Sequence, residues 1–376
     1  MKILFNCLNL KKGGAERVIS ILANEFINNN EVTILTLMNM KDSYELSPNI
    51  KRIRVDKNDS YSLNPLKKVL KKLSIARLVK FKKEIINEHP DVIISFLPEP
   101  SLRLMFVRKF SKKLQKIPVI ISIRNDPNIE YKSLIIKHLM KYLYKSVDGM
   151  VFQTTDAKAY FDDIINFKNT EIIANPINDE FLNGLNQKVI KYNRIVTVGR
   201  LEPQKNHKLL IDVFARVIKK YPDYTLEIYG EGSLRDELSK LINNLGVQNN
   251  VKLCGQVDDV KEKLLSSKIF VLSSDYEGMP NALMEAMALG LPCISTNCPC
   301  GGPKELIDNG KSGLLIPVND KDALYKSIID LINDEKLLEN ISKNAINIRK
   351  NNNAKVIVNK WKTFIKKVGD DCYDEK

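Results

Sequence analysis

Residues 194–207, RIVTVGRLEPQKNH, place a β-rich run directly before a glycine, a basic loop and a longer amphipathic stretch. The same order recurs along the whole chain, which is the pattern of parallel βαβ units. From residue 194 onward it predicts strands at 194–198, 225–229, 251–253, 269–272, 292–295 and 314–316. An earlier series predicts strands at 2–8, 32–37, 91–96, 118–123, 150–152 and 171–173. The sequence therefore predicts two open, doubly wound α/β sheets.

The size of the chain also favours two domains. It has 376 residues, of which 44% are hydrophobic, and that is more than one compact core normally holds. A polar stretch that begins at Asn175-Pro176 interrupts the periodicity between the two series. We expect an N-terminal domain at 1–180, a second domain at 181–345, and a helical segment at 346–376 that packs back toward the first domain.

The apolar runs are of strand length. None approaches the roughly 20 residues of a membrane-spanning helix, and the N-terminal MKILFN meets a polar residue before any signal-like apolar stretch forms. We therefore expect a cytoplasmic protein without a membrane span. The net charge of +14 is uneven, with +11 in residues 1–190 and +3 in residues 191–376. A negatively charged partner is expected to meet the N-terminal half.

Two glycine motifs follow predicted strands. Gly13-Gly14 opens a helical stretch after the first strand, where small residues let a bound group approach the anion-attracting N–H groups of a helix start. A glycine pair also occurs at such turns for steric reasons alone, so phosphate contact and a structural role are both open. Gly230-Glu231-Gly232, in the second series, lacks the third glycine of the dinucleotide fingerprint.

The loop after strand 194–198 carries Arg200 and Lys205, five residues apart. Open α/β sheets bind ligands at the carboxyl edge of their strands, where this loop lies. A guanidinium fork with an ammonium group suits a pyrophosphate. A solvated basic loop is the alternative.

The stretch 273–287, SSDYEGMPNALMEAM, contains a second candidate cluster. Pro280 suits the first turn of a helix, which places Glu277 on the preceding loop and Glu285 inside the helix. Free N–H groups at the helix start can bind phosphate or sugar oxygens. The two glutamates could instead be a cap neighbour and an exposed helix residue, although apolar neighbours make a solvated position for Glu285 unfavourable.

These pieces, taken in order, resemble one family. Gly-Gly-Ala-Glu-Arg at 13–17, Arg200 with Lys205, Gly-Glu-Gly at 230–232, and Glu277 seven residues before Glu285 closely resemble the retaining glycosyltransferases of family 4. The likeness covers essentially the whole chain and is strongest over 194–318. It implies the GT-B fold, with two Rossmann-like α/β domains facing a central cleft. The sequence is also similar to bacterial enzymes that build lipid-linked glycans, capsule or lipopolysaccharide.

The resemblance implies roles residue by residue. Arg200 and Lys205 match the pair that neutralises the donor diphosphate, Glu277 matches the glutamate beside the donor sugar, and Glu285 matches the residue that binds the ribose hydroxyls. The implied catalytic set is Glu277, Arg200 and Lys205. The further donor-binding residues implied are Gly14, Gly230, Glu231, Gln256, Val257, Gly278, Met279, Pro280 and Asn281.

The acceptor side departs from the family pattern. Relatives often carry a histidine after the fourth N-terminal strand, whereas Arg124 appears at this point of the chain. An arginine can bind a phosphate or sugar oxygen but cannot accept a proton. Arg17, Arg124 and Asp126 are the acceptor-side candidates, and for Asp126 a capping role before Pro127 is equally open.

No metal or cofactor is expected. The three histidines (His89, His138 and His207) are far apart in the sequence, and Asp320-Lys321-Asp322 is typical of the start of a surface helix. Cationic side chains would neutralise the diphosphate instead.

Residues 64–83 contain eight Lys and Arg and no acid, with apolar residues at helical spacing. This predicts a basic amphipathic segment that holds the protein at the anionic inner face of the plasma membrane. A solvated helix is the alternative. Nucleic-acid binding is disfavoured, because few aromatic residues are available for stacking on bases.

The expected activity is the transfer of a hexose or N-acetylhexosamine, with retention, from a nucleotide diphosphate sugar. A UDP-sugar is the expected donor, and a lipid-linked or oligosaccharide acceptor would receive the sugar in cell-surface glycan synthesis. The alternatives are a sugar-nucleotide epimerase or phosphorylase of the same fold, and a non-catalytic polyanion-binding protein.

Overall fold

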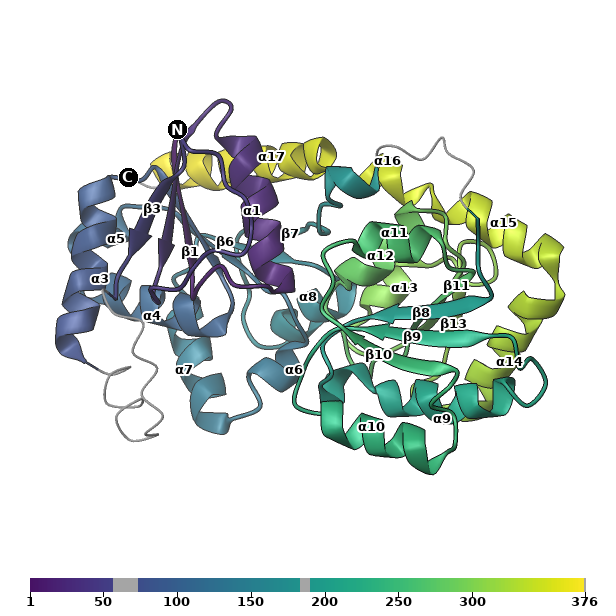
Figure 1. The fold of residues 1–376 in the computed structure, drawn as a ribbon. Coiled ribbons are helices and arrows are strands. Elements are labelled where there is room, and N and C mark those ends of the chain that lie inside the picture. Colours follow the sequence, from purple (N-terminus) through teal and green to yellow (C-terminus); the bar gives the residue numbers. More distant parts are fainter. Residues whose placement is uncertain (57–73, 183–189, 375–376) are drawn as a thin grey trace. The chain divides into compact units, whose positions relative to one another are not determined.

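The computed structural model describes residues 1–56, 74–182 and 190–374. The chain forms two compact units (Figure 1). Unit 1 comprises Met1–Pro176 together with Ala354–Lys376, and unit 2 comprises Ile177–Asn353. Both are built on parallel sheets, as the sequence predicts.

The sheet of unit 1 has the strand order β3-β2-β1-β4-β5-β6-β7 among the described residues. Its strands are β1 (Lys2–Cys7), β2 (Glu31–Thr36), β3 (Lys51–Arg54), β4 (Val92–Phe96), β5 (Val119–Ser122), β6 (Gly149–Phe152) and β7 (Thr170–Ile172). Six of them were predicted to within about two residues at each end. The prediction of a six-stranded sheet was wrong, because β3 is a seventh strand at its edge. Its sequence, KRIR, is mostly charged and lacks the apolar pattern by which the other strands were predicted.

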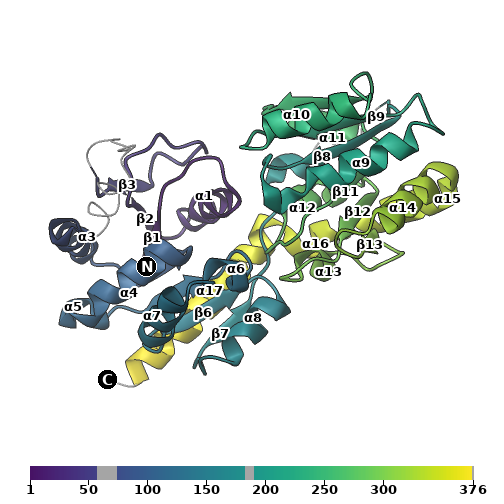
Figure 2. The ribbon, with the colours of Figure 1, turned by 90° about the horizontal axis from the view of Figure 1, so that it is seen from below.

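The central strands of unit 1 are apolar because helices cover both faces of the sheet. The helices are α1 (Gly14–Phe26), α3 (Ile75–Glu88), α4 (Pro98–Lys109), α5 (Lys112–Gln115), α6 (Pro127–Glu130), α7 (Leu134–Tyr144), α8 (Thr155–Asp162) and α17 (Ala354–Asp374). Trp361 of α17 is fully buried in this core and lies 6.2 Å, ring to ring, from Phe96. Figure 2 shows α17 next to β6, where a Cβ on Gly149 would come within 2.8 Å of Val368.

The sheet of unit 2 has the order β10-β9-β8-β11-β12-β13 among the described residues. Its strands are β8 (Arg194–Val198), β9 (Thr225–Tyr229), β10 (Val251–Gly255), β11 (Ile269–Leu272), β12 (Cys293–Thr296) and β13 (Leu314–Ile316). All six lie where the sequence predicts strands.

The helices of unit 2 alternate with these strands. They are α9 (His207–Val217), α10 (Arg235–Asn244), α11 (Val260–Leu265), α12 (Asn281–Ala288), α13 (Gly302–Leu306), α14 (Lys321–Asn333), α15 (Glu335–Ala345) and α16 (Ile348–Asn352), with 3-10 turns at Asp179–Phe181 and Pro203–Lys205. Residues 346–353 belong to unit 2, so the terminal segment of unit 1 begins later than the residue 346 expected. Arg349 Nε donates to the Ala288 carbonyl over 2.6 Å and so attaches α16 to α12.

In both sheets the strand order reverses direction at one point. It does so between β1 and β4 in unit 1 and between β8 and β11 in unit 2. At such a switch point the loops from the two neighbouring strands run in opposite directions and leave a crevice between them. Open α/β sheets usually bind their ligands in this crevice. Within the described part of the chain, no helix is both long and apolar enough to cross a bilayer.

Candidate active site

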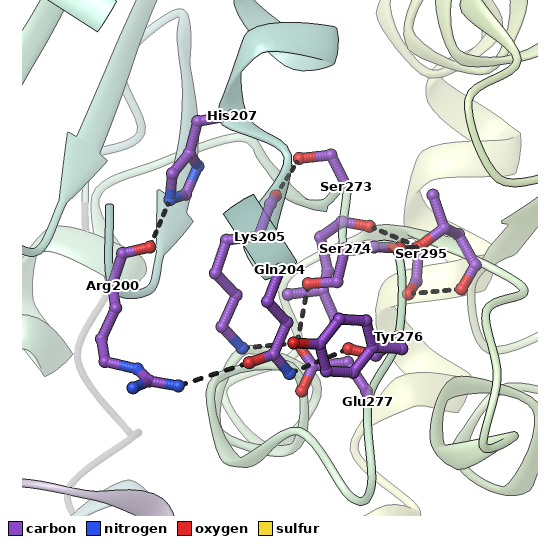
Figure 3. A network of polar contacts seen from close by, with 11 residues as sticks. Arg200, Gln204, Lys205, His207, Ser273, Ser274, Tyr276, Glu277 and Ser295 are labelled. Atoms are coloured by element: carbon purple, nitrogen blue, oxygen red, sulfur yellow. Dashed lines mark hydrogen bonds and ion pairs between the residues drawn. The ribbon is translucent and has the colours of Figure 1, made fainter. Parts of the chain in front are cut away.

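The candidate active site of unit 2 lies at its switch point, where the loops after β8 and β11 meet (Figure 3). Arg200, Gln204 and Lys205 come from the first loop, and Ser274, Tyr276 and Glu277 come from the second. The backbone N–H of Asp275 donates to the Gln204 carbonyl over 2.9 Å, which joins the two loops. The structure therefore brings Arg200, Lys205 and Glu277 together, as the sequence predicts.

Lys205 and Glu277 form a largely buried ion pair. The Lys205 Nζ donates to Glu277 Oε1, and the exposed fractions of the two side chains are 16% and 7%. The Ser274 hydroxyl donates to the same carboxylate oxygen over 2.7 Å. The Ser273 hydroxyl donates to the Lys205 carbonyl over 2.9 Å and fixes the backbone that carries the ammonium group. The pair thus holds one positive and one negative group at the switch point in a defined position.

Arg200 is exposed and is positioned through Gln204. Its Nη2 donates to Gln204 Oε1 over 3.3 Å, and Gln204 Nε2 donates to the Tyr276 carbonyl over 2.9 Å. The guanidinium group has no carboxylate among the hydrogen-bond partners found in the described residues. It can therefore accept an anionic ligand without first breaking an ion pair.

His207 supports the Arg200 backbone. Its ring Nε2 lies 3.2 Å from the Arg200 carbonyl, and the ring is buried. Burial lowers the pKa of His207 to about 4, an effect that the hydrogen bond to Arg200 partly opposes. The ring is therefore neutral at pH 7, and the Nε2 tautomer donates to the carbonyl.

The Glu277 loop leads directly into α12. Pro280 occupies the N-cap position and Asn281 is the first helical residue, whereas the sequence placed Pro280 inside the first turn. Glu277 exchanges backbone hydrogen bonds with a neighbouring loop, donating to the Pro299 carbonyl over 2.6 Å and accepting from Cys300 N–H over 3.0 Å. The loop is thereby fixed at the helix start, whose N–H groups attract anions.

Gly302 explains how that neighbouring loop comes so close. A Cβ on Gly302 would lie 1.6 Å from the Gly278 carbonyl oxygen, so any larger residue would displace the Glu277 loop. Glu285 lies on α12 and is 4% exposed, which excludes the solvated role that the sequence left open. Met279 and Pro280 are buried, while Asn281 is partly exposed.

The turn after β9 packs against the Arg200 loop. Gly230 has φ +147°, and a Cβ there would lie 1.9 Å from the Gly199 carbonyl oxygen. Glu231 accepts the backbone N–H of Leu201 through its own carbonyl over 3.0 Å, and its carboxylate pairs with Arg235 on the surface at 2.8 Å. The glycine motif thus has a steric reason within unit 2. Gln256 is exposed after β10, and Val257 is half-buried beside it.

In unit 1 the glycine motif begins α1. Gly13 is its N-cap, and the Tyr44 hydroxyl accepts the Gly13 N–H over 2.9 Å and donates to its carbonyl over 2.8 Å. Gly14 is exposed, and Arg17 is half-buried in the first turn.

Arg124 is a buried cation at the carboxyl end of β5. Its Nη1 donates to Asn175 Oδ1 over 2.7 Å, and the guanidinium carbon lies 4.5 Å from the Phe96 ring centroid and 5.9 Å from that of Trp361. Burial lowers the pKa of Arg124 to about 9, so it remains protonated at pH 7. No described residue hydrogen-bonds its Nε or Nη2. Asp126 caps α6 by accepting the Asn128 N–H over 2.9 Å.

The Asp320 motif has the helix-capping role expected of it. Asp320 accepts the backbone N–H groups of Asp322 and Ala323 over 3.1 and 2.8 Å at the start of α14. Over residues 1–56, 74–182 and 190–374, no three His, Cys, Asp or Glu side chains are grouped in a way that could hold a metal ion.

Sequence reasoning missed three contributors to this site. Gln204 positions Arg200, Ser274 positions Glu277, and Gly302 admits the Glu277 loop. Gln204 and Ser274 lie inside stretches that the sequence singled out, on the loops that follow strands β8 and β11, so this location was an available signal. Gly302 carried none, because its requirement arises from a loop 24 residues earlier in the chain.

Two family models together match nearly the whole chain. The model for Glycosyltransferase Family 4 matches residues 12–181, and the model for Glycosyl transferases group 1 matches residues 181–348. An uncharacterized glycosyltransferase of Methanocaldococcus jannaschii is 32% identical over 344 residues, which are 80% of this chain and 83% of that protein.

A Campylobacter jejuni transferase is also similar to this chain. N-acetylgalactosamine-N,N'-diacetylbacillosaminyl-diphospho-undecaprenol 4-alpha-N-acetylgalactosaminyltransferase is 31% identical over 342 residues, covering 88% of this chain and 89% of that one. Among solved structures, Anabaena HepE in complex with UDP has a TM-score of 0.78 at 17% identity, with 98% of this chain and 100% of that chain covered. At that identity the structural likeness supports the fold alone.

Proposed function

The chain belongs to the glycosyltransferases of family 4, and from this membership we propose the reaction that its candidate site carries out. It transfers a hexose or N-acetylhexosamine from a nucleotide diphosphate sugar to a lipid-linked or oligosaccharide acceptor, with retention at the anomeric carbon. The donor is a UDP-sugar, a choice supported by the UDP-Gal in the name of an Escherichia coli relative that is 34% identical over 170 residues. The lipid-linked acceptor is supported by the diphospho-undecaprenol in the name of the Campylobacter jejuni relative.

The observation that carries the proposal is the convergence at the switch point of unit 2. The loop that carries Arg200 and Lys205 meets the loop that leads into α12, and Lys205 is paired there with Glu277. An anionic group bound at this point would meet the exposed guanidinium of Arg200, the paired ammonium of Lys205 and a helix N-terminus. Such a combination fits two linked phosphates better than a single carboxylate, because each phosphate presents several acceptor oxygens.

The proposed mechanism rests on stabilising the leaving group. The acceptor hydroxyl oxygen forms a bond to the anomeric carbon as the bond between that carbon and the phosphate oxygen breaks. The electron pair of the broken bond stays on the nucleoside diphosphate, which takes up the hydroxyl proton. Arg200, Lys205 and the α12 N–H groups neutralise this developing charge, and they are already in position before the reaction. Because side chains and backbone supply the neutralisation, the reaction proceeds without a divalent metal ion.

The two glutamates have different proposed roles. Glu277 shares its carboxylate between Lys205 and Ser274, which orients it beside the donor sugar whose hydroxyls it binds. Glu285 binds the ribose hydroxyls. The backbone of Gly278 to Asn281 contacts sugar and phosphate, and Gly230, Glu231, Gln256 and Val257 flank the nucleotide.

Unit 1 supplies the acceptor side in this proposal. Gly14 approaches the donor phosphates, and Arg17 and Arg124 bind acceptor oxygens. Arg124 cannot serve as a base, since its guanidinium stays protonated. The Asp126 carboxylate already caps α6, so in this proposal it does not bind the acceptor itself and instead fixes the backbone that follows Arg124.

We also propose that the protein acts in the cytoplasm at the inner face of the plasma membrane and that the basic segment 64–83 contributes to this attachment. Residues 64–73 of it lie outside the described residues. In the part that is described, Arg77 pairs with Asp56 at 2.7 Å and Lys80 donates to the Val55 carbonyl, so these two cations contact unit 1 itself. Ile75 and Val79 on α3 are 77% and 55% exposed, which suits a face turned toward lipid.

A panel of nucleotide sugars tests the proposal. Thermal stabilisation and sugar transfer are measured for UDP-, GDP- and ADP-sugars, with and without a polyprenyl-diphosphate-linked acceptor. We expect stabilisation by a UDP-sugar and transfer only when acceptor is present. Conversion of the donor without acceptor would indicate an epimerase, phosphate-dependent cleavage would indicate a phosphorylase, and binding of polyanions with no turnover of any donor would indicate a non-catalytic protein.

A further inference from the structure

Helix α7 presents large apolar side chains to solvent. Leu134 is 73% exposed, Ile135 is 81%, Leu139 is 41% and Tyr142 is 57%, whereas Met140, Leu143 and Tyr144 of the same helix are buried in unit 1. The exposed residues follow helical spacing, with positions 135, 139 and 142 on one side. The apolar exposure is thus a continuous helix face with no covering element among the described residues, and such faces mark interaction sites in globular proteins.

The end of α4 extends this face. Phe106 and Phe110 are 42% and 71% exposed, and their rings stack edge to face at 5.3 Å. One helical turn from Phe106, the Lys109 ammonium lies 3.6 Å above the ring centroid of Tyr142, so the two helices meet at this point. We call Phe106, Phe110, Leu134, Ile135, Leu139 and Tyr142 the α4–α7 surface.

Positive charge surrounds the α4–α7 surface. Residues 101–147 contain eleven Lys and Arg against two acids. Exposed or half-exposed lysines flank the apolar residues at the end of α4, on α5 and α7, and beside these two helices: Lys109, Lys112, Lys113, Lys116, Lys132, Lys137, Lys141 and Lys145.

The two acids do not offset this charge. Asp126 is 3% exposed and caps α6, while burial raises the pKa of Glu130 to about 8, so that its carboxyl group is mostly neutral at pH 7. The part of the rim that residues 101–147 supply is therefore mainly cationic.

We propose that the α4–α7 surface inserts into the interface of an anionic lipid bilayer, with its apolar side chains among the acyl chains and its lysines at the lipid phosphates. Apolar side chains bordered by lysines are the composition that binds such interfaces. A second copy of the chain would bring an identical lysine rim against this one, and the like charges would oppose the contact. This inference deepens the proposed function, in which the acceptor is a membrane lipid, and adds a site separate from segment 64–83.

The first test compares two isoleucines of nearly equal exposure. Ile135→Asp places a charge in the α4–α7 surface, and Ile190→Asp places one in unit 2, where the native side chain is 76% exposed. Full-length proteins are sedimented with vesicles of phosphatidylcholine containing phosphatidylglycerol. We expect Ile135→Asp to weaken binding about tenfold or more, since one buried aliphatic side chain is lost, and Ile190→Asp to bind like the wild type. Equal binding of both variants, or no binding of the wild type, overturns the proposal.

The second test removes charge and leaves the apolar face intact. Lys113→Gln with Lys141→Gln is compared with Lys240→Gln and Lys336→Gln on the exposed sides of α10 and α15 in unit 2. We expect the first pair to weaken binding about 30-fold at low salt, because each lysine near an anionic leaflet contributes about fivefold. The second pair should have little effect. Equal loss for both pairs would mean that only net charge matters and would overturn the site.

Sedimentation velocity without lipid tests whether a second copy of the chain covers the α4–α7 surface instead of a bilayer. A monomer that is unchanged by Ile135→Asp supports the bilayer, whereas a dimer that this substitution dissociates overturns it in favour of self-association. Vesicle binding needs neither donor nor acceptor, so its failure is distinct from failure of the transferase assay.

Discussion

Replacement of Lys205 by alanine probes the centre of the candidate site. The substitution removes the cation that pairs with Glu277 and leaves a carboxylate that is 7% exposed, with the Ser274 hydroxyl as its remaining side-chain donor among the described residues. Removing one member of a buried pair costs about 3–5 kcal/mol, and the 16% exposure of Lys205 favours the lower end. We therefore expect the free energy of unfolding of unit 2 to fall by about 3 kcal/mol.

The same substitution removes a charge that stabilises the leaving group. Loss of one preorganised partner of this kind lowers kcat by about 10²–10³. Because lost stability alone could reduce activity, Arg200→Ala is the necessary companion. Arg200 is exposed, so its removal should change the free energy of unfolding by less than about 0.5 kcal/mol while kcat falls on the same scale.

The measurement combines kinetics with denaturation. The value of kcat is determined at saturating donor, and urea unfolding is followed by far-ultraviolet circular dichroism, since the sole tryptophan, Trp361, belongs to unit 1 and does not report on unit 2. Arg216→Ala is the matched control: it removes an exposed arginine of α9 that pairs with Asp322 at the surface. Turnover near the wild-type rate in both Lys205→Ala and Arg200→Ala would refute the leaving-group assignment.

A stability test isolates the ion pair. If the cost of Lys205→Ala comes from the stranded carboxylate, combining Lys205→Met with Glu277→Gln should restore most of the lost stability, because neither side chain is then charged. A double variant as unstable as Lys205→Ala would show that the ion-pair reasoning is wrong, whatever the kinetics show.

Three further predictions concern the same unit. Gly302→Ala should displace the Glu277 loop, raise KM for the donor and cost about 1–3 kcal/mol in urea unfolding, whereas Gly369→Ala, which meets no atom within 4 Å, should have no such effect. His207 has a lowered pKa, so the unfolded chain binds its proton first, and stability is complete above pH 6.5 and falls toward pH 4. His207→Gln should therefore reduce the pH dependence of unfolding over this range by up to about 3 kcal/mol, and an unchanged dependence would exclude this origin. Activity should persist in EDTA, and a loss that Mg²⁺ reverses would show that a metal takes part.

The fold could be predicted because hydrophobic patterning specifies it locally. Ile269–Leu272 is apolar throughout and Val92–Phe96 is apolar apart from Ser95, and every residue of both strands is buried in the structure. β3 was not predicted because an edge strand pairs with a neighbour on one side only and can therefore be polar. Arg52 and Arg54 of β3 both pair with Asp42, at 2.9 and 3.0 Å, so its stability comes from contacts that patterning does not reveal.

The residues of the candidate site could be predicted, but the contacts between them could not. Arg200, Lys205 and Glu277 follow strands, and strand ends share one edge of a parallel sheet. Their proximity, however, depends on β8 and β11 being neighbours, which the sequence does not state. The Lys205–Glu277 pair spans 72 residues of chain and arises only because the switch point joins those two strands.

The α4–α7 surface could not be predicted from the sequence either. Its residues 134–144, LIIKHLMKYLY, have the composition of an ordinary core-facing helix with lysines at intervals. Only the packing reveals that Met140 and Leu143 fill the interior of unit 1 while Ile135 and Tyr142 do not. Sequence reasoning therefore assigned lipid contact to the segment with the most charge, 64–83, whereas the described structure adds a face with both charge and uncovered apolar area. Since lysines attract a bilayer but apolar side chains must enter it for the contact to resist salt, binding that persists at high salt and depends on Ile135 would distinguish the α4–α7 surface from a purely electrostatic attachment.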